Sequence, residues 1–147
     1  MSKKRKKELP PLALETVQAG FPSPAAQYIE NALDLNELLV PYPVGTYFVR
    51  VSGESMVGAG ILPDDILIVD RTLDAANGSI VVAAVDGEFT VKYLRRDKNG
   101  VRLEPANEKF KPIVLEDGME LQLFGVVSGV VRQLVRRKGG NLNVRAG

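Results

Sequence analysis

The chain has 147 residues, 45% hydrophobic and 25% charged, which is typical of one globular domain with a single core. It contains no histidine and no cysteine, which excludes a Ser-His-Asp triad, a Cys-His dyad and a zinc site built on nitrogen and sulfur ligands. No apolar run approaches the roughly 20 residues that span a bilayer, and no apolar stretch follows the basic N-terminus as in a secretory signal. We therefore expect a cytoplasmic protein with no membrane anchor, no cofactor and no bound metal.

The formal net charge of +1 conceals a separation of charge along the sequence. Residues 8–131 hold 9 basic and 18 acidic residues, a net charge of −9. The basic residues at the two ends are Lys3, Lys4, Arg5, Lys6, Lys7, Arg132, Arg136, Arg137, Lys138 and Arg145. A surface that binds phosphates needs clustered positive charge. Direct DNA binding by the core is therefore not expected, and the basic ends are either DNA-binding or simply solvated tails.

The chain is predicted to begin with an extended arm, residues 1–23, in which Pro10, Pro11, Gly20 and Pro22 interrupt any regular pattern. A β-rich domain is predicted over residues 24–135, and a basic tail over residues 136–147. The arm carries no apolar pattern that would build a core.

A short helix is expected at the start of the domain. Ser23 suits the N-cap and Pro24 the first helical position. The apolar residues on one face of this helix are Tyr28, Ile29, Ala32 and Leu33. Asp34, with Glu37 three residues later, predicts a second capped turn that ends near Pro41.

From Thr46 onward the pattern indicates β-strands. The expected strands are residues 47–51, 66–69, 80–85, 89–94, 101–103, 113–115, 121–127 and 130–135. Asp86 and Gly87 supply the turn of one hairpin, and residues 98–100 the turn of another. Short strands between Gly, Asp and Pro turns predict a mainly β fold, a small antiparallel barrel or sandwich with an extended N-terminal arm and a short helix.

The most informative pair in the chain is Ser55 and Lys92. With no histidine present, a serine nucleophile would need lysine as its base, and lysine accepts a proton only when it is neutral. Burial lowers the pKa of an ammonium group by as much as roughly 3–5 units. The alternative is an ordinary turn serine and a solvated lysine. Alternation with Phe89 and Val91 predicts that Lys92 points away from the aromatic face, into water if the sheet has one buried side.

A series of sequence blocks in a fixed order closely resembles the LexA/UmuD-type self-cleaving proteins, and most closely their UmuD branch. The resemblance covers residues 17–131. The blocks are residues 17–26 (VQAGFPSPAA), 52–56 (SGESM), 78–92 (GSIVVAAVDGEFTVK), Pro105, Asn107, Pro112, Ile113 and 124–127 (FGVV). One block alone would be weak evidence, whereas the ordered series is specific.

The resemblance implies the roles of individual residues. Ser55 would be the nucleophile, Lys92 the general base and Ala19-Gly20 the bond that is cut. Backbone N–H groups near Glu54 and Ser55 would stabilise the oxyanion. An alanine before the bond suits a narrow pocket, and a glycine after it permits a tight bend.

Two positions depart from the family pattern. Asp64 stands where a glycine is usual, and Ser79 stands where an aspartate often follows the glycine.

The function implied by the resemblance is conditional self-cleavage. The product, residues 20–147, would be an accessory subunit of an error-prone translesion DNA polymerase in the SOS response to DNA damage. Expected partners are a second copy of the chain, the polymerase catalytic subunit, and a recombinase filament of the RecA type on single-stranded DNA that triggers cleavage. A fragment of a self-cleaving transcriptional repressor, or a noncatalytic β-rich binding module, are the alternatives.

Overall fold

The structure, a computed structural model, describes residues 8–13, 16–17, 19–20 and 30–135, without the side chains of residues 30 and 31. The chain divides into two compact units, Met1–Pro41 and Tyr42–Gly147. The predicted helix start at Ser23 and Pro24, the boundary at residue 23 and the basic tail 136–147 lie outside the described residues. No helix in the described part of the chain has the length and apolar character needed to cross a membrane.

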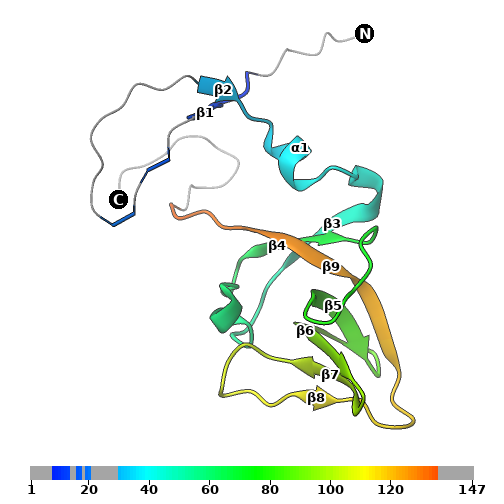
Figure 1. The fold of residues 1–147 in the computed structure, drawn as a ribbon. Coiled ribbons are helices and arrows are strands. Elements are labelled where there is room, and N and C mark those ends of the chain that lie inside the picture. The colour runs from blue at the N-terminus through cyan, green and yellow to red at the C-terminus, as the bar shows by residue number, and fades with distance from the viewer. Residues whose placement is uncertain (1–7, 14–15, 18, 21–29, 136–147) are drawn as a thin grey trace. The chain divides into compact units, whose positions relative to one another are not determined.

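The first unit contains a small antiparallel pair of strands (Figure 1). β1 (Pro11–Ala13) pairs with β2 (Glu30–Ala32), with Pro11 opposite Ala32 and Ala13 opposite residue 30. The Leu33 N–H extends the ladder by donating to the Pro10 carbonyl at 2.8 Å. The expectation of an arm without regular structure is therefore wrong at β1, and Ala32 lies in a strand rather than on a helix. Proline is compatible with β1 because Pro11 is its first residue.

A single helical turn, α1 (Leu35–Leu39), follows this pair. Asp34 is its N-cap, and the Asp34 carboxylate accepts a hydrogen bond from the Asn36 N–H at 2.9 Å. The capped turn predicted from Asp34 and Glu37 is therefore confirmed. Glu37 lies in the first turn, where its negative charge interacts favourably with the positive end of the helix dipole.

The second unit is one antiparallel sheet of seven strands, so the mainly β prediction is confirmed. The sheet order is β3-β4-β9-β5-β6-β7-β8, and β3 and β8 end it without closing a barrel. Its elements are η1 (Pro43–Gly45), β3 (Thr46–Arg50), η2 (Val57–Ala59), β4 (Ile66–Asp70), β5 (Ile80–Val85), β6 (Glu88–Asp97), β7 (Gly100–Glu104), β8 (Ile113–Val114) and β9 (Leu121–Val131).

The long strand β9 joins the two halves of this sheet (Figure 1). Its second half pairs with β4 and its first half with β5, and a register shift interrupts each ladder. Gly125 lies at the crossing with a φ of +147°, and an added Cβ would lie 2.6 Å from Val69 Cγ1. The sequence predicted two strands here, split near Ser128 and Gly129. The structure shows one, because bulges let a strand bend without ending.

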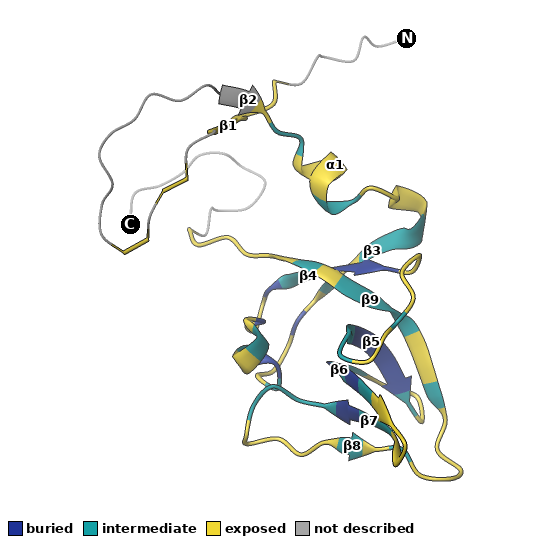
Figure 2. Ribbon diagram, in the orientation of Figure 1, coloured by how far each residue is buried: buried dark blue, intermediate teal, exposed yellow. Residues whose placement is uncertain are grey.

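The buried residues form two core clusters, and β5, drawn mostly dark blue in Figure 2, contributes to both. Along β5, Val81 and Ala83 belong to one core cluster, while Val82 belongs to the other. The first cluster also holds Leu94 and Leu103. The second comprises Val51, Met56, Ile61, Leu67, Val69 and Val82. A strand such as β6 is therefore covered on both sides, and a side chain that points away from one core does not reach open water.

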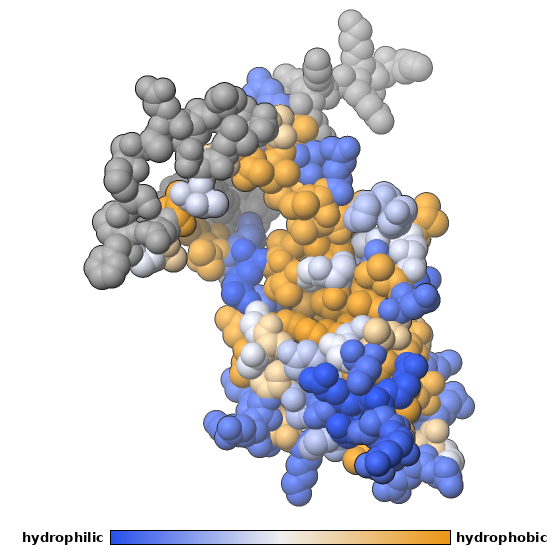
Figure 3. Space-filling view, viewed as in Figure 1, coloured by the Kyte–Doolittle hydropathy of each residue, from blue (hydrophilic) through white to orange (hydrophobic). Residues whose placement is uncertain are grey.

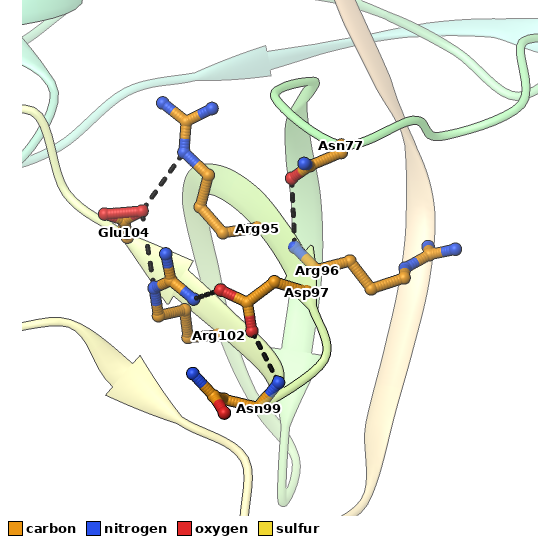
Figure 4. A network of polar contacts seen from close by, with 7 residues as sticks. All are labelled: Asn77, Arg95, Arg96, Asp97, Asn99, Arg102 and Glu104. Atoms are coloured by element: carbon orange, nitrogen blue, oxygen red, sulfur yellow. Dashed lines mark hydrogen bonds and ion pairs between the residues drawn. The ribbon is translucent and has the colours of Figure 1, made fainter.

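Ion pairs connect β6 and β7 across their hairpin (Figure 4). Arg95 Nε lies 3.1 Å from Glu104 Oε1, and Arg102 Nη1 lies 2.7 Å from Asp97 Oδ2. Arg102 Nε also approaches Glu104 at 3.5 Å. Such partly exposed pairs contribute little to stability, because solvent screens them. The first two pairs connect β7 to β6, the strand that carries Lys92.

Candidate active site

The segment that carries Ser55 is a tight turn between β3 and η2. Gly53 adopts a φ of +84°, a conformation that strongly favours glycine. The Glu54 carbonyl accepts from the Val57 N–H at 3.3 Å, and the Met56 carbonyl accepts from the Ile61 N–H at 3.2 Å. These contacts fold the chain back on itself, and Ser55 is left half-buried at the start of η2.

Lys92 reaches this turn from the middle of β6. Its Nζ lies 3.0 Å from Ser55 Oγ, although the two residues are 37 positions apart in the sequence. The Lys92 side chain is only 9% exposed. Burial lowers the pKa of its ammonium group, because a desolvated charge is costly. Ion pairs among the described residues do not include Lys92, so no carboxylate counteracts this shift.

The expectation that Lys92 would face water if one side of the sheet were open is thereby resolved. Alternation does point it away from Val91 and Tyr93, but the opposite side of β6 is also covered. The lysine is therefore held in an environment that favours its neutral form, as a general base requires.

Thr90 is a further member of the site that the sequence analysis did not identify. Its hydroxyl is within hydrogen-bond distance of Lys92 Nζ. The signal in the sequence is its spacing, because residues two apart on a strand point to the same face. With one N–H donated to Thr90, neutral Lys92 can direct its lone pair toward Ser55.

A cleft of about 470 Å³ opens in front of the Ser55–Lys92 pair. Its walls are mainly apolar and come from β3, the turn, β5, β6 and the segment after β7. The lining side chains include Tyr47, Val49, Val51, Met56, Ile61, Val82, Phe89, Val91 and Phe110. A depression of this size and character accommodates a short apolar peptide segment.

The back of the turn is tied to residues 106 and 107. The Ala106 N–H donates to the Ser55 carbonyl at 2.7 Å, and Asn107 Nδ2 donates to the Glu54 carbonyl at 2.9 Å. The Gly58 N–H donates to the Ala106 carbonyl at 2.7 Å, so close that a Cβ on Gly58 would lie 2.5 Å from that oxygen. Three hydrogen bonds therefore hold the turn and η2 to residues 106 and 107.

Ala19 and Gly20 belong to the first unit, between β1 and β2, and both are exposed. A Cβ built on Gly20 meets no atom within 4 Å among the described residues. The described residues therefore impose no steric requirement for glycine at this position. The requirement for glycine in a bound, bent segment stays a prediction.

The chain is similar in sequence to known proteins over most of its length. Residues 11–128 match the family model described as Peptidase S24-like. The chain belongs to this peptidase family. It is 43% identical over 125 residues to Protein ImpA of Salmonella typhimurium, covering 84% of the chain and 83% of ImpA. It is 44% identical over 119 residues to Protein MucA of Escherichia coli, covering 80% of the chain and 81% of MucA.

A LexA repressor is also among the relatives. The chain is 37% identical over 120 residues to the LexA repressor of Clostridium novyi, covering 82% of the chain and 58% of that repressor. The resemblance to LexA/UmuD-type proteins that the motifs indicated is therefore confirmed.

The two departures from the family pattern have structural explanations. Asp64 has a φ of +73°, so a glycine is usual here because a left-handed residue favours one. Asp64 adopts the same backbone conformation, with more strain than a glycine would have. Ser79 Oγ accepts a hydrogen bond from the Ala76 N–H at 2.9 Å, and an aspartate would also offer a side-chain oxygen acceptor.

Arg132, counted among the basic residues of the C-terminal end, has a structural partner. Its Nε and Nη2 each lie 2.6 Å from an oxygen of Asp65, and its Nη2 also donates to the Gly60 carbonyl at 2.8 Å. The guanidinium holds the pKa of the buried Asp65 carboxyl below its usual range. Arg132 therefore anchors the end of β9 to the loop that follows the turn carrying Ser55.

Proposed function

We propose that this chain is a serine peptidase that cuts its own Ala19-Gly20 bond, with Ser55 as nucleophile and Lys92 as general base. The observation that carries the proposal is the 3.0 Å contact between Ser55 Oγ and the Nζ of a buried lysine. Membership of a peptidase family supports it independently.

The proposed reaction has two steps, in which an ester on Ser55 forms and is then hydrolysed. Neutral Lys92 accepts the hydroxyl proton as Ser55 Oγ bonds to the carbonyl carbon of Ala19. The negative charge that develops on the carbonyl oxygen is stabilised by backbone N–H groups near Glu54 and Ser55. When the C–N bond breaks, the Lys92 ammonium returns the proton to the amine of Gly20. Water then hydrolyses the ester on Ser55, with Lys92 again accepting a proton.

Self-cleavage is tested by following intact mass during incubation, with and without a recombinase filament on single-stranded DNA. We expect one cut and a new N-terminus at Gly20. Because the lost fragment has five basic and two acidic residues, the formal net charge falls from +1 to −2. Ser55→Ala should remain intact, while the matched control Ser52→Ala in the same turn should be cut. Cleavage of Ser55→Ala, or cleavage only at other bonds, would overturn the assignment.

The role we infer for the product is that of an accessory subunit of a translesion DNA polymerase in the SOS response. The similarity to ImpA and MucA over most of their length supports this over the repressor alternative, whereas the chain aligns with 58% of the LexA repressor. A peptidase that cuts only itself turns over once, so the lasting role is binding.

A homodimer is part of this proposal. Apolar side chains are exposed over β3, β4 and β9 (Figure 3), including Phe48 at 60% and Val131 at 39% exposure. The register places the apolar residues Ile66 and Val131 side by side on β4 and β9. An apolar sheet face of this kind is suited to burial against a second copy.

The cellular role is tested by co-purification with the host's polymerases followed by a lesion-bypass assay. We expect the cleaved form to bind a polymerase and support bypass, and Ser55→Ala to bind it in a less active form. If precursor, product and Ser55→Ala support bypass equally, cleavage is not the switch. Binding of the intact chain to operator-like DNA, with no polymerase bound, would favour a repressor.

A further inference from the structure

We propose that Asn107 is a positioning residue that aims the N–H group of Ser55 into the cleft, where the oxyanion forms. The inference rests on the proposed peptidase function and assigns the residue that orients its backbone donors. Asn107 Nδ2 donates to the Glu54 carbonyl at 2.9 Å, from a position 53 residues later in the chain. The neighbouring Ala106 N–H holds the Ser55 carbonyl at 2.7 Å.

The effect on the N–H groups follows from the geometry of the peptide bond. The peptide bonds of the described chain include no cis bond, and in a planar trans peptide the C=O and N–H point in opposite directions. The Glu54 carbonyl shares its peptide with the Ser55 N–H, and the Ser55 carbonyl shares its peptide with the Met56 N–H. Holding both carbonyls on one side of the turn therefore turns both N–H groups to the other side.

That other side is the cleft. Glu54, Ser55 and Met56 line it, whereas Ala106 and Asn107 are not among the described residues that do. The hydrogen bonds of the described residues include none donated by the Ser55 or Met56 N–H. Two backbone donors on the cleft side of a nucleophile are the arrangement that stabilises an oxyanion.

Asn107 is itself held in one orientation. Its Oδ1 accepts from the Lys109 N–H at 3.0 Å while its Nδ2 donates to Glu54. The two contacts need opposite atoms of the amide, so they define which end faces the turn. Asn107→Asp keeps the acceptor for Lys109 but replaces the donor to Glu54 with an oxygen. Asn107→Ala removes both contacts.

The first measurement is the rate of self-cleavage of the full chain as a function of pH. We expect Asn107→Ala and Asn107→Asp to lower the plateau rate at alkaline pH by at least about tenfold, since loss of one oxyanion donor typically costs 10²–10³ in rate. The pH midpoint of Asn107→Ala should stay at the wild-type value because Lys92 is unchanged. Asn99→Asp, which adds the same charge on an exposed turn, should cleave at the wild-type rate.

The second measurement detects the donors directly. A boronic acid analogue of alanine adds to Ser55 Oγ, the proton passes to Lys92, and a negatively charged boronate occupies the position of the intermediate. In the wild-type chain we expect the amide proton resonances of Ser55 and Met56 to move downfield. In the Asn107 variants the Ser55 response should be lost and the affinity for the analogue should fall about tenfold. An effect on folding alone would lower the melting temperature without abolishing this response.

Different results would contradict the peptidase assignment and the positioning role of Asn107. If Ser55→Ala still cleaves, the peptidase assignment is wrong. If the wild-type chain cleaves but both Asn107 variants reach its plateau rate within twofold, the positioning role is wrong. An unchanged Ser55 resonance when the boronic acid binds the wild-type chain would also exclude that role, even if neither variant folds.

Discussion

Lys92 is the residue on which the proposed chemistry depends, because the base must be neutral. Its pKa is lowered by burial, so the neutral fraction at a given pH is larger than for a solvated lysine. We expect the self-cleavage rate to rise with pH through this lowered pKa and then to level off. First-order rates from mildly acidic to strongly alkaline pH provide the test. A flat profile would show that lysine is not the base.

Two substitutions of Lys92 test the same assignment. Lys92→Ala should abolish cleavage because no base remains. Lys92→Arg should abolish it as well, because arginine stays protonated at every accessible pH. Self-cleavage that survives in Lys92→Ala would contradict the assignment, whatever the shape of the wild-type profile.

The same burial predicts that Lys92 weakens the fold. A lysine with a lowered pKa binds fewer protons when folded than when unfolded, so folding stability rises as pH increases toward the ordinary lysine pKa. Lys92→Met should therefore raise the melting temperature at neutral pH, and this gain should shrink at alkaline pH. Melting curves of both chains at neutral and alkaline pH provide the comparison. Equal melting temperatures at neutral pH would mean that the buried ammonium is not destabilising.

Thr90 offers a test of how the base is oriented. Thr90→Val keeps the shape of the side chain but removes the hydroxyl that bonds Lys92 Nζ. One hydrogen bond is worth about 1 kcal/mol, so the plateau rate should fall roughly tenfold or less. Thr90→Ser restores the hydroxyl and should recover most of the rate. If valine and serine variants behave alike, the contact has no part in cleavage.

At the scale of elements, Gly125 determines how β9 passes from one half of the sheet to the other. Gly125→Ala would place a methyl group 2.6 Å from Val69 Cγ1 and 3.3 Å from the Asp70 carbonyl oxygen. We expect a loss of about 2–4 kcal/mol of unfolding free energy, since overpacking adds to backbone strain. Chemical denaturation measures it.

The matched control is Gly100→Ala. Gly100 has a φ of +119°, yet an added Cβ would meet no atom within 4 Å. The Gly100→Ala variant should therefore lose only the unfolding free energy that backbone strain costs, about 1–2 kcal/mol. Equal losses at the two glycines would show that the contact with Val69 does not matter.

The strands of the sheet could be predicted from the sequence because each is encoded locally. The apolar runs of β4 and β5 and the turn at Asp86 and Gly87 are such signals. β1 could not be predicted, because a three-residue strand that begins at a proline has no periodicity and is defined by its pairing with β2. The continuity of β9 was missed for a similar reason, since the bulges depend on two partner strands.

The candidate site, like the fold, could be predicted from the sequence only in part. Ser55 and Lys92 were identified from residue types and ordered motifs. The contacts of Asn107 with Glu54 and of Arg132 with Asp65 join positions more than 50 residues apart, and the sequence alone does not say which polar side chains will meet. Whether Lys92 is buried depended equally on what covers the second face of β6.

At the scale of the whole molecule, the proposed cut falls between two strands that pair with each other. β1 lies before Ala19 and β2 lies after Gly20. The Leu33 N–H, bonded to the Pro10 carbonyl, should exchange with solvent faster after cleavage than before. Hydrogen exchange on the precursor, the product and Ser55→Ala provides the measurement, with Ser55→Ala as the protected control. Protection of Leu33 that persists in the purified product would mean that the fragment stays bound.

Before the cut, β1 and β2 belong to one chain, so their pairing is intramolecular and takes place at a high effective concentration. Once the bond is broken, the same three residue pairs must hold two separate molecules together at the far lower concentration of the protein in solution. Dilution would then favour their separation, and the backbone groups of β2 that faced β1 would become an open strand edge. Such an edge can accept an extended segment of another chain, so the proposed hydrolysis would convert a strand that had its own partner into one that is free to pair with another.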